Sequence, residues 1–221
     1  MNPLAERVQA LQERIRRACE ACGRDPETVE LLPVSKRQPV SLIRHAADLG
    51  FRSFGENYVQ EGTAKAQELP GLDFLLLGPL QRNKAKPALE HFKELMSVDR
   101  PELVSRLQHL AGELKVARRL WIQVDLWGEE TKMGGCPASG IGELTRMLEG
   151  DPWLSLQGFM AIPPPGDAQA FPEMGALRED WRQKLGRDLR LSMGMSGDLE
   201  DAIAAGSDQI RIGTAFFGER A

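Results

Sequence analysis

From about residue 30 to its end, the chain alternates short apolar runs with longer segments of helical periodicity. Strands that are apolar throughout are typical of parallel sheets covered on both faces, and their connections are helical, so the alternation predicts an α/β fold. The expected strands are 31–35, 51–54, 74–77, 95–98, 120–126, 156–162, 189–193 and 209–212. The expected helices between them are 39–49, 59–68, 83–91, 101–114, 139–148, 168–185 and 199–205.

Eight strand–helix units predict a single-domain (β/α)8 TIM barrel, for which 221 residues is a short chain. A doubly wound open sheet is the alternative, but its dinucleotide-binding form would carry a GxGxxG motif after the first strand, where this sequence has none. Residues 1–25 are charged and amphipathic, which predicts an N-terminal helix packed on the barrel. We expect residues 1–221 to form one domain, because no long linker interrupts the pattern.

Composition excludes several classes of protein. With 28 Lys and Arg against 32 Asp and Glu, the net charge of −4 argues against a nucleic-acid partner. No apolar run approaches the ~20 residues that span a bilayer, and the N-terminus lacks a secretory apolar core, so we expect a cytoplasmic protein without a membrane partner. The CxxC pair, Cys19 and Cys22, lies late in a helical pattern without a second pair, and we expect no metal site.

Candidate functional residues follow the strands, because the active face of such a barrel lies at the C-terminal ends of its strands. Lys36 directly follows the first apolar run, where an amine shielded from water can act as a nucleophile and form a Schiff base. A lysine that extends to solvent at the barrel rim is the alternative. Ser196 follows the seventh run, and Gly213 and Thr214 follow the eighth. The turns after strands seven and eight often hold phosphate, so free N–H groups, hydroxyls and the dipole of a helix expected from about Asp198 predict a phosphate site.

Arg211 lies two residues before Gly213 in an apolar context, so strand alternation directs both to the same side. An inward arginine can donate to a ring nitrogen or a phosphate, and an ion pair inside the barrel is the alternative. A lysine and a phosphate site with a basic group between them is the arrangement that pyridoxal 5'-phosphate (PLP) requires. A sugar-phosphate aldolase would also use a lysine and a phosphate site, but normally with further acid and base groups facing the lysine.

Over essentially its whole length, the sequence resembles the pyridoxal phosphate homeostasis protein family, whose fold is like the N-terminal barrel domain of alanine racemase (PLP fold type III). The matching stretches are VSK at 34–36, FGENYVQE at 54–61, GPLQRNKAK at 78–86, SVD at 97–99, QVDLWGEETKMG at 123–134, LQGFMAIPP at 156–164, LSMGMSGD at 191–198 and RIGTAFFGER at 211–220. Their order and combination are highly specific. One departure is Pro79, where family members often have His, so no role of that His carries over.

The resemblance implies a role for each matching residue. Lys36 would hold PLP as a covalent Schiff base, an internal aldimine, and Asn57 would line the pocket near the ring. Ser196 and the turn of Gly213 and Thr214 would bind the phosphate. Arg211 would face the pyridine nitrogen, and an arginine there disfavours protonation of that nitrogen, which makes the ring a poorer electron sink.

The implied function is PLP binding in intracellular vitamin B6 and amino-acid homeostasis, without robust catalysis. PLP and other B6 vitamers would be the ligands, PLP-dependent apo-enzymes would be the recipients, and the protein would be a monomer or a weak homodimer. A PLP-dependent amino-acid racemase is the alternative. Racemases with this barrel use a tyrosine base delivered by a second domain across a dimer, whereas this chain has one tyrosine, Tyr58, and no second domain is expected. A scaffold protein with a vestigial pocket is a further alternative.

Overall fold

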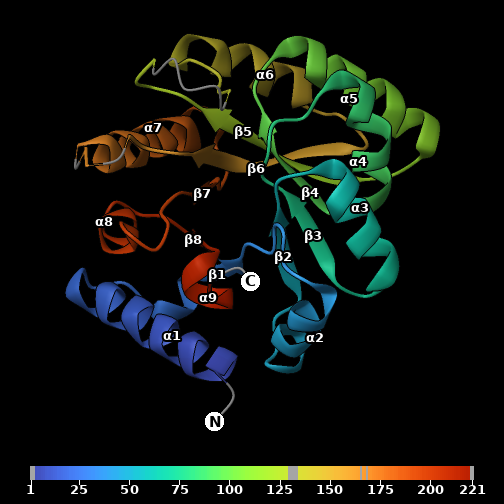
Figure 1. The fold of residues 1–221 in the computed structure, drawn as a ribbon. Coiled ribbons are helices and arrows are strands. Elements are labelled where there is room, and N and C mark those ends of the chain that lie inside the picture. Colours follow the sequence, from blue (N-terminus) through green and yellow to red (C-terminus); the bar gives the residue numbers. More distant parts are fainter. Residues whose placement is uncertain (1–2, 129–133, 165, 168, 220–221) are drawn as a thin grey trace.

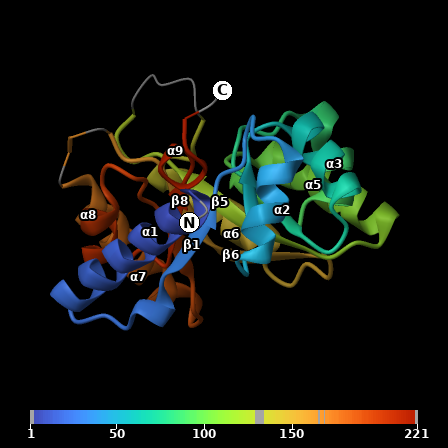
Figure 2. The same ribbon diagram turned by 60° about the horizontal axis from the view of Figure 1, so that its bottom comes forward.

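In the computed structural model, eight parallel strands form one sheet that curls into a barrel, and the helices lie on its outer side (Figures 1 and 2). The structure describes residues 3–128, 134–164, 166–167 and 169–219. The strands are β1 (Glu30–Pro33), β2 (Ser53–Glu56), β3 (Asp73–Leu76), β4 (Glu94–Val98), β5 (Arg118–Val124), β6 (Leu154–Ala161), β7 (Arg190–Ser192) and β8 (Gln209–Ile212). The α-helices are α1 (Pro3–Ala21), α2 (Val40–Asp48), α3 (Val59–Glu68), α4 (Ala85–His91), α5 (Pro101–Leu114), α6 (Ile141–Leu148), α7 (Ala170–Leu185), α8 (Leu199–Ala204) and α9 (Thr214–Phe217). The predicted single-domain barrel is confirmed.

The predicted strands are all present, with small differences at their ends. The second begins at Ser53 rather than at residue 51, because pairing with β3 begins opposite Asp73. The helix expected over 83–91 begins at Ala85, after a turn of 3-10 helix at Arg82–Lys84. These shifts leave the order of strands and helices unchanged, so each strand still delivers the following turn to the same end of the barrel.

The barrel is nearly closed. The strand order is β1-β8-β7-β6-β5-β4-β3-β2, so every neighbouring pair except β1 and β2 forms a ladder. Between those two strands, the described residues form a single parallel bridge, Val34 with Gly55, beside which the Ser35 N–H donates to the Gly55 carbonyl at 2.9 Å. We call this junction the β1–β2 seam. It lies directly next to Lys36.

Two separate apolar clusters fill the fold. The larger lies between the strands and the outer helices, and the smaller, Leu32, Leu75, Met96, Trp121 and Met160, comes from five different strands. Inward side chains of alternate strand positions build such an inner cluster, which makes the middle of the barrel solid. Among the described residues, the barrel interior is therefore filled, and a cavity within the barrel can open only at the ends of the strands.

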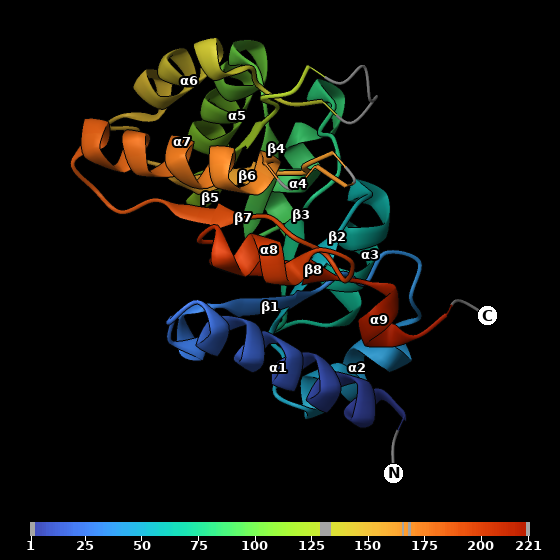
Figure 3. The same cartoon turned by 90° about the vertical axis from the view of Figure 1, so that its left-hand side faces the viewer.

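Helix α1 takes the place of the outer helix that would follow the last strand. Helix α9 has only 4 residues, about one turn, and is too short to cover β8 and β1. The 19-residue helix α1 lies there instead, beside α8 and α9 (Figure 3). It turns the stripe Leu4, Val8, Leu11 and Ile15 into the core, at the spacing of one helix face. In the described part of the chain, no helix is long and apolar enough to cross a membrane.

Replacing Gly112 with alanine is expected to raise the free energy of unfolding by about 0.5–1 kcal/mol, because glycine inside a helix is less favourable than alanine by that amount. Gly112 lies inside α5, and an added Cβ would meet its first neighbour, the Trp153 Nε1, at an ordinary 3.9 Å. Urea denaturation of the wild type and the variant measures the difference. A lower midpoint for the variant would contradict the expectation.

Candidate functional site

A cavity of about 360 Å³ opens at the C-terminal ends of the strands. Its size falls within the ~300–1,000 Å³ of small-molecule sites. All the site residues singled out from the sequence lie on its wall, namely Lys36, Asn57, Ser196, Arg211, Gly213 and Thr214. The other lining residues are Val34, Leu77, Met160, Ile162 and Met195. Part of the cavity lining is therefore apolar, and the polar groups that the sequence pointed to converge on a single space.

The backbone on both sides of Lys36 is fixed. Before it, the Ser35 N–H is bonded to the Gly55 carbonyl across the seam. After it, the Arg37 N–H donates to the Glu61 carboxylate of α3 at 2.5 Å, and the Gln38 N–H donates to the Ser35 carbonyl at 2.9 Å. Arg37 adopts a φ of 57°, a left-handed conformation that a non-glycine residue adopts only when its surroundings hold it. The turn thus presents the Lys36 side chain, which is half-buried, at the cavity wall.

A buried ion cluster supports this turn from behind. The Lys65 ammonium, only 6% exposed, donates to the Ser35 carbonyl at 2.7 Å, to Glu56 Oε1 at 2.7 Å and to Glu61 Oε1 at 2.6 Å. The Ser35 hydroxyl also donates to Glu56 Oε1, at 2.6 Å. Lys65 therefore ties the ends of β1 and β2 to α3 at the seam, where the ladder itself is a single bridge.

Glu56 is the residue of this cluster whose charged form is disfavoured by burial. Burial raises its pKa, and the hydrogen bonds from Lys65 and Ser35 oppose that shift. Its second oxygen, Oε2, is buried and has no hydrogen-bond partner among the described residues. The sequence interpretation missed the cluster. Its signal was the spacing of Val59, Gly62 and Lys65, which puts Lys65 on the buried stripe of α3.

Another part of the cavity wall is built by the turns after β7 and β8, and the turn after β8 adjoins the end of β1. Within the described chain, the N–H groups of Ser196, Gly213 and Thr214 donate to no other residue, and neither do the hydroxyls of Ser196 and Thr214. Gly194 shapes the first turn, because its φ is 94° and an added Cβ would lie 2.4 Å from the Ala202 Cβ. These free donors suit an anion such as phosphate.

The expected contribution of a helix dipole to this wall is small, which corrects the sequence interpretation. A macrodipole needs many aligned peptide units, whereas α8 has 6 residues and α9 has 4. Helix α8 begins at Leu199, with Asp198 as its N-cap residue. The anion-binding character of the wall therefore rests on individual N–H groups and hydroxyls.

Arg211 lies inside the barrel, as alternation predicted, and is 6% exposed. Its Nη1 donates to the Ser192 Oγ at 2.9 Å, and its Nη2 donates to the Ala161 carbonyl at 2.8 Å. Among the described residues it makes no salt bridge, so the ion pair considered as an alternative is absent there. Burial lowers the pKa of Arg211 to about 10, which leaves it charged at neutral pH. A guanidinium has five N–H donors and these bonds use two, so donors remain for a ligand at the cavity wall.

Tyr58 and Pro79 lie outside the cavity lining. The Tyr58 side chain is half-exposed, and its ring centroid lies 5.9 Å from the Arg37 guanidinium carbon. Pro79, the position at which the sequence departs from the resemblance, is exposed. The neighbouring residue Asn57 does line the cavity, at the end of β2.

Comparisons with known proteins agree with this geometry. The family model of the alanine racemase N-terminal domain matches residues 7–221. An alanine racemase of Clostridium difficile 630 matches with a TM-score of 0.80 at 13% identity, over 100% of this chain and 57% of that chain, which shows the shared fold alone. The fold is thus that of the alanine racemase barrel.

Relatives with higher sequence identity identify the family within this fold. The pyridoxal phosphate homeostasis protein of Pseudomonas aeruginosa is 41% identical over 100% of this chain and 97% of its own length, and that of Escherichia coli K12 is 39% identical over 100% and 98%. The structure of PipY from Synechococcus elongatus PCC7942 with PLP bound has a TM-score of 0.84 at 36% identity, over 97% of this chain and 100% of that chain. This chain belongs to the pyridoxal phosphate homeostasis protein family.

Proposed function

We propose that this protein binds PLP in the cavity, as a Schiff base on Lys36, and acts in PLP and amino-acid homeostasis. The observation that carries the proposal is the convergence of Lys36, Arg211 and the free donors of Ser196 and Thr214 on one cavity. The relative of known structure from Synechococcus elongatus has PLP bound, and the curated relatives are named for PLP homeostasis. Their identity to this chain, 36% and 41%, supports a shared ligand.

The residues present fit this ligand. PLP would supply a reactive aldehyde, which a primary amine captures, and a dianionic phosphate, which N–H and hydroxyl donors bind. Lys36 offers the amine, and the Ser196 and Thr214 turns offer the donors. Arg211 is charged and is only a hydrogen-bond donor, so next to the pyridine nitrogen it would keep that nitrogen unprotonated. Such a site favours holding the cofactor over carbanion chemistry.

Storage and transfer fit the cavity better than racemisation. A racemase needs a second base on the face of the ring opposite the lysine. Tyr58 is the only tyrosine of the chain and lies outside the lining, and Lys36 and Arg211 are the only titratable residues on the described wall. The proposal therefore extends to amines, other B6 vitamers or PLP-dependent apo-enzymes as acceptors at the open mouth, for a cytoplasmic protein that is a monomer or a weak homodimer.

Absorption spectroscopy with PLP tests the Lys36 assignment. We expect the wild type to develop a band near ~420 nm that borohydride reduction removes, with the label on the peptide containing Lys36. Lys36→Ala should lose the band and that label, whereas Lys184→Ala, a change at an exposed lysine of α7, should keep both. A wild type without the band would overturn PLP binding through a Schiff base. Equal labelling of Lys36→Ala would overturn the assignment to Lys36.

A chiral assay separates the racemase alternative. Optically pure alanine incubated with the PLP-loaded protein should keep its enantiomeric purity, because the described residues of the wall offer no second base. Loss of purity that depends on Lys36 would favour the racemase.

A further inference from the structure

Helix α1 carries an arginine that holds the turn after β7. Arg14 binds both carboxylate oxygens of Glu200 in α8, with 2.6 Å between its Nη2 and Oε2, and its Nη1 donates to the Ser196 carbonyl at 2.7 Å. The hydrogen bond from Arg14 lowers the pKa of Glu200, as expected for a carboxylate held in an ion pair. Ser196 lines the cavity at the anion-binding wall, and its N–H and hydroxyl donate to no other described residue. Arg14 thus grips the phosphate-side turn from outside the barrel.

A second arginine of the same helix holds the turn after β8. The Arg7 Nε donates to the Phe216 carbonyl at 3.0 Å, and its Nη2 donates to the Phe217 carbonyl at 2.9 Å. These are end carbonyls of α9, which have no partner within the helix. Helix α9 begins at Thr214, so fixing its end fixes the orientation of the turn of Gly213 and Thr214.

The two arginines that hold these turns belong to the same helix, α1. Arg7 and Arg14 are seven residues apart, nearly two helical turns, and so project from the same side of α1. Helices of 4 and 6 residues, such as α9 and α8, are not stable alone and depend on tertiary contacts for their position. Helix α1 lies against both of them (Figure 3) and so holds the two turns at a fixed distance from each other.

We propose that Arg7 and Arg14 are positioning residues for the phosphate, and that α1 thereby sets the preference of the cavity for phosphorylated over unphosphorylated pyridoxal. The inference rests on the proposed function, with the phosphate at Ser196 and Thr214. Neither arginine lines the cavity. They act by keeping N–H groups of two separate turns directed at the same anion, and displacing such groups by a fraction of an ångström weakens their joint hydrogen bonding.

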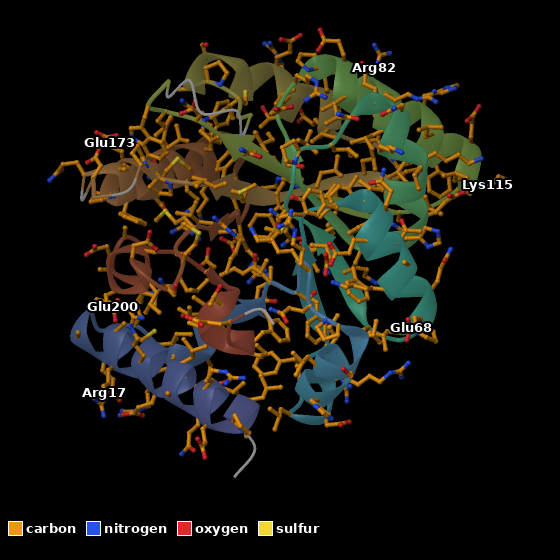
Figure 4. All side chains as sticks on the ribbon, viewed as in Figure 1. Arg17, Glu68, Arg82, Lys115, Glu173 and Glu200 are labelled. Carbon is orange, nitrogen blue, oxygen red and sulfur yellow. The ribbon has the colours of Figure 1, made fainter. Side chains whose placement is uncertain are left out.

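Helix α1 also provides a matched control. Arg17 is 74% exposed and pairs with Glu13 of its own helix. Figure 4 shows Arg17 on the outer side of α1 and Glu200 between α8 and α1. Replacing Arg17 removes the same charge from the same helix without touching either turn.

The test compares PLP with pyridoxal, which carries the same aldehyde and ring but no phosphate. Affinities are measured by absorbance titration for Arg7→Met, Arg14→Met, the double variant and Arg17→Met. We expect each single change to weaken PLP binding on the order of tenfold and the double change to weaken it more, while pyridoxal affinity stays at the wild-type value. Arg17→Met should match the wild type for both ligands.

Parallel losses for PLP and pyridoxal would overturn the proposal, because they would mean that the arginines only stabilise the fold. Unchanged PLP affinity in both single variants would overturn it as well. If the double variant does not fold, Arg14→Lys and Glu200→Gln provide the same comparison. Each weakens the contact between Arg14 and the turn after β7 with a smaller change to the side chain. A wild type that binds neither ligand would overturn the proposed function itself. A wild type that binds both equally well would overturn the phosphate site and the role of α1, and would leave the Schiff base on Lys36.

Discussion

Replacing Lys65 with methionine is expected to lower the free energy of unfolding by about 3–5 kcal/mol at neutral pH, the usual cost of removing one partner from a buried ion pair. Methionine retains much of the apolar stem, so the change removes mainly the ammonium and its three hydrogen bonds. Glu56, which is fully buried, then loses its cation, and the Ser35 carbonyl loses its donor. Because Ser35 precedes Lys36, we also expect weaker PLP uptake.

This loss should depend on pH in a defined direction. Burial raises the Glu56 pKa and Lys65 lowers it. Removing Lys65 therefore leaves the effect of burial less opposed, and the Glu56 pKa should rise. A carboxylic acid whose pKa is higher in the folded than in the unfolded state adds to the free energy of unfolding while it is protonated. This contribution is complete below the unfolded-state pKa of ~4.3 and is lost as the pH rises through the folded-state pKa. The deficit of Lys65→Met should therefore be smallest in acid and largest at neutral pH.

Urea denaturation at several pH values measures this deficit. Lys65→Met combined with Glu56→Gln should recover much of the lost stability at neutral pH, because no buried charge remains unpaired. Lys184→Met, at a lysine that is 55% exposed, should stay within about 0.5 kcal/mol of the wild type. A deficit that does not change between acid and neutral pH would contradict the assigned role of Glu56.

The parts of this structure that the sequence predicted are those set by local pattern. Apolar runs of strand length, each followed by a helical period, are enough to give the strand order, since parallel strands joined by helices are neighbours in space. Once the barrel is assumed, the residues after each strand must meet at one end. That is why Lys36, Ser196 and Arg211, which are far apart in the sequence, were expected at one end of the barrel, where they line one cavity.

The parts that the sequence did not predict depend on pairings between distant elements. Lys65 looks like one more charged residue of a surface helix until the seam brings Glu56 and the Ser35 carbonyl to it. Arg14 and Arg17 are both charged residues of one amphipathic helix, and only the position of α8 distinguishes the one that holds a turn from the one in solvent. Periodicity identifies the buried face of an element but not the partner that covers it.

Replacing Gly78 with alanine is expected to lower the free energy of unfolding by about 3 kcal/mol, at the upper end of the usual cost of overpacking. An added Cβ would lie 2.0 Å from the Asn57 carbonyl oxygen and 2.8 Å from its carbon, so it would meet backbone rather than a side chain that can turn away. On its other side, the Gly78 carbonyl accepts a hydrogen bond from the Ser97 hydroxyl at 2.6 Å. Gly78 therefore cannot move away from Asn57 without straining that buried bond.

The same change should reach the site, because the strain is relieved most easily by displacing Asn57, which lines the cavity at the end of β2. We expect Gly78→Ala to weaken PLP binding as well as the fold, as measured by thermal unfolding and absorbance titration of one preparation. Gly112→Ala adds the same methyl group where there is room for it and should instead raise stability. Wild-type stability for Gly78→Ala would mean that the close approach of the β2 and β3 ends is not required. Lost stability with unchanged PLP affinity would mean that Asn57 bounds the cavity without contributing to binding.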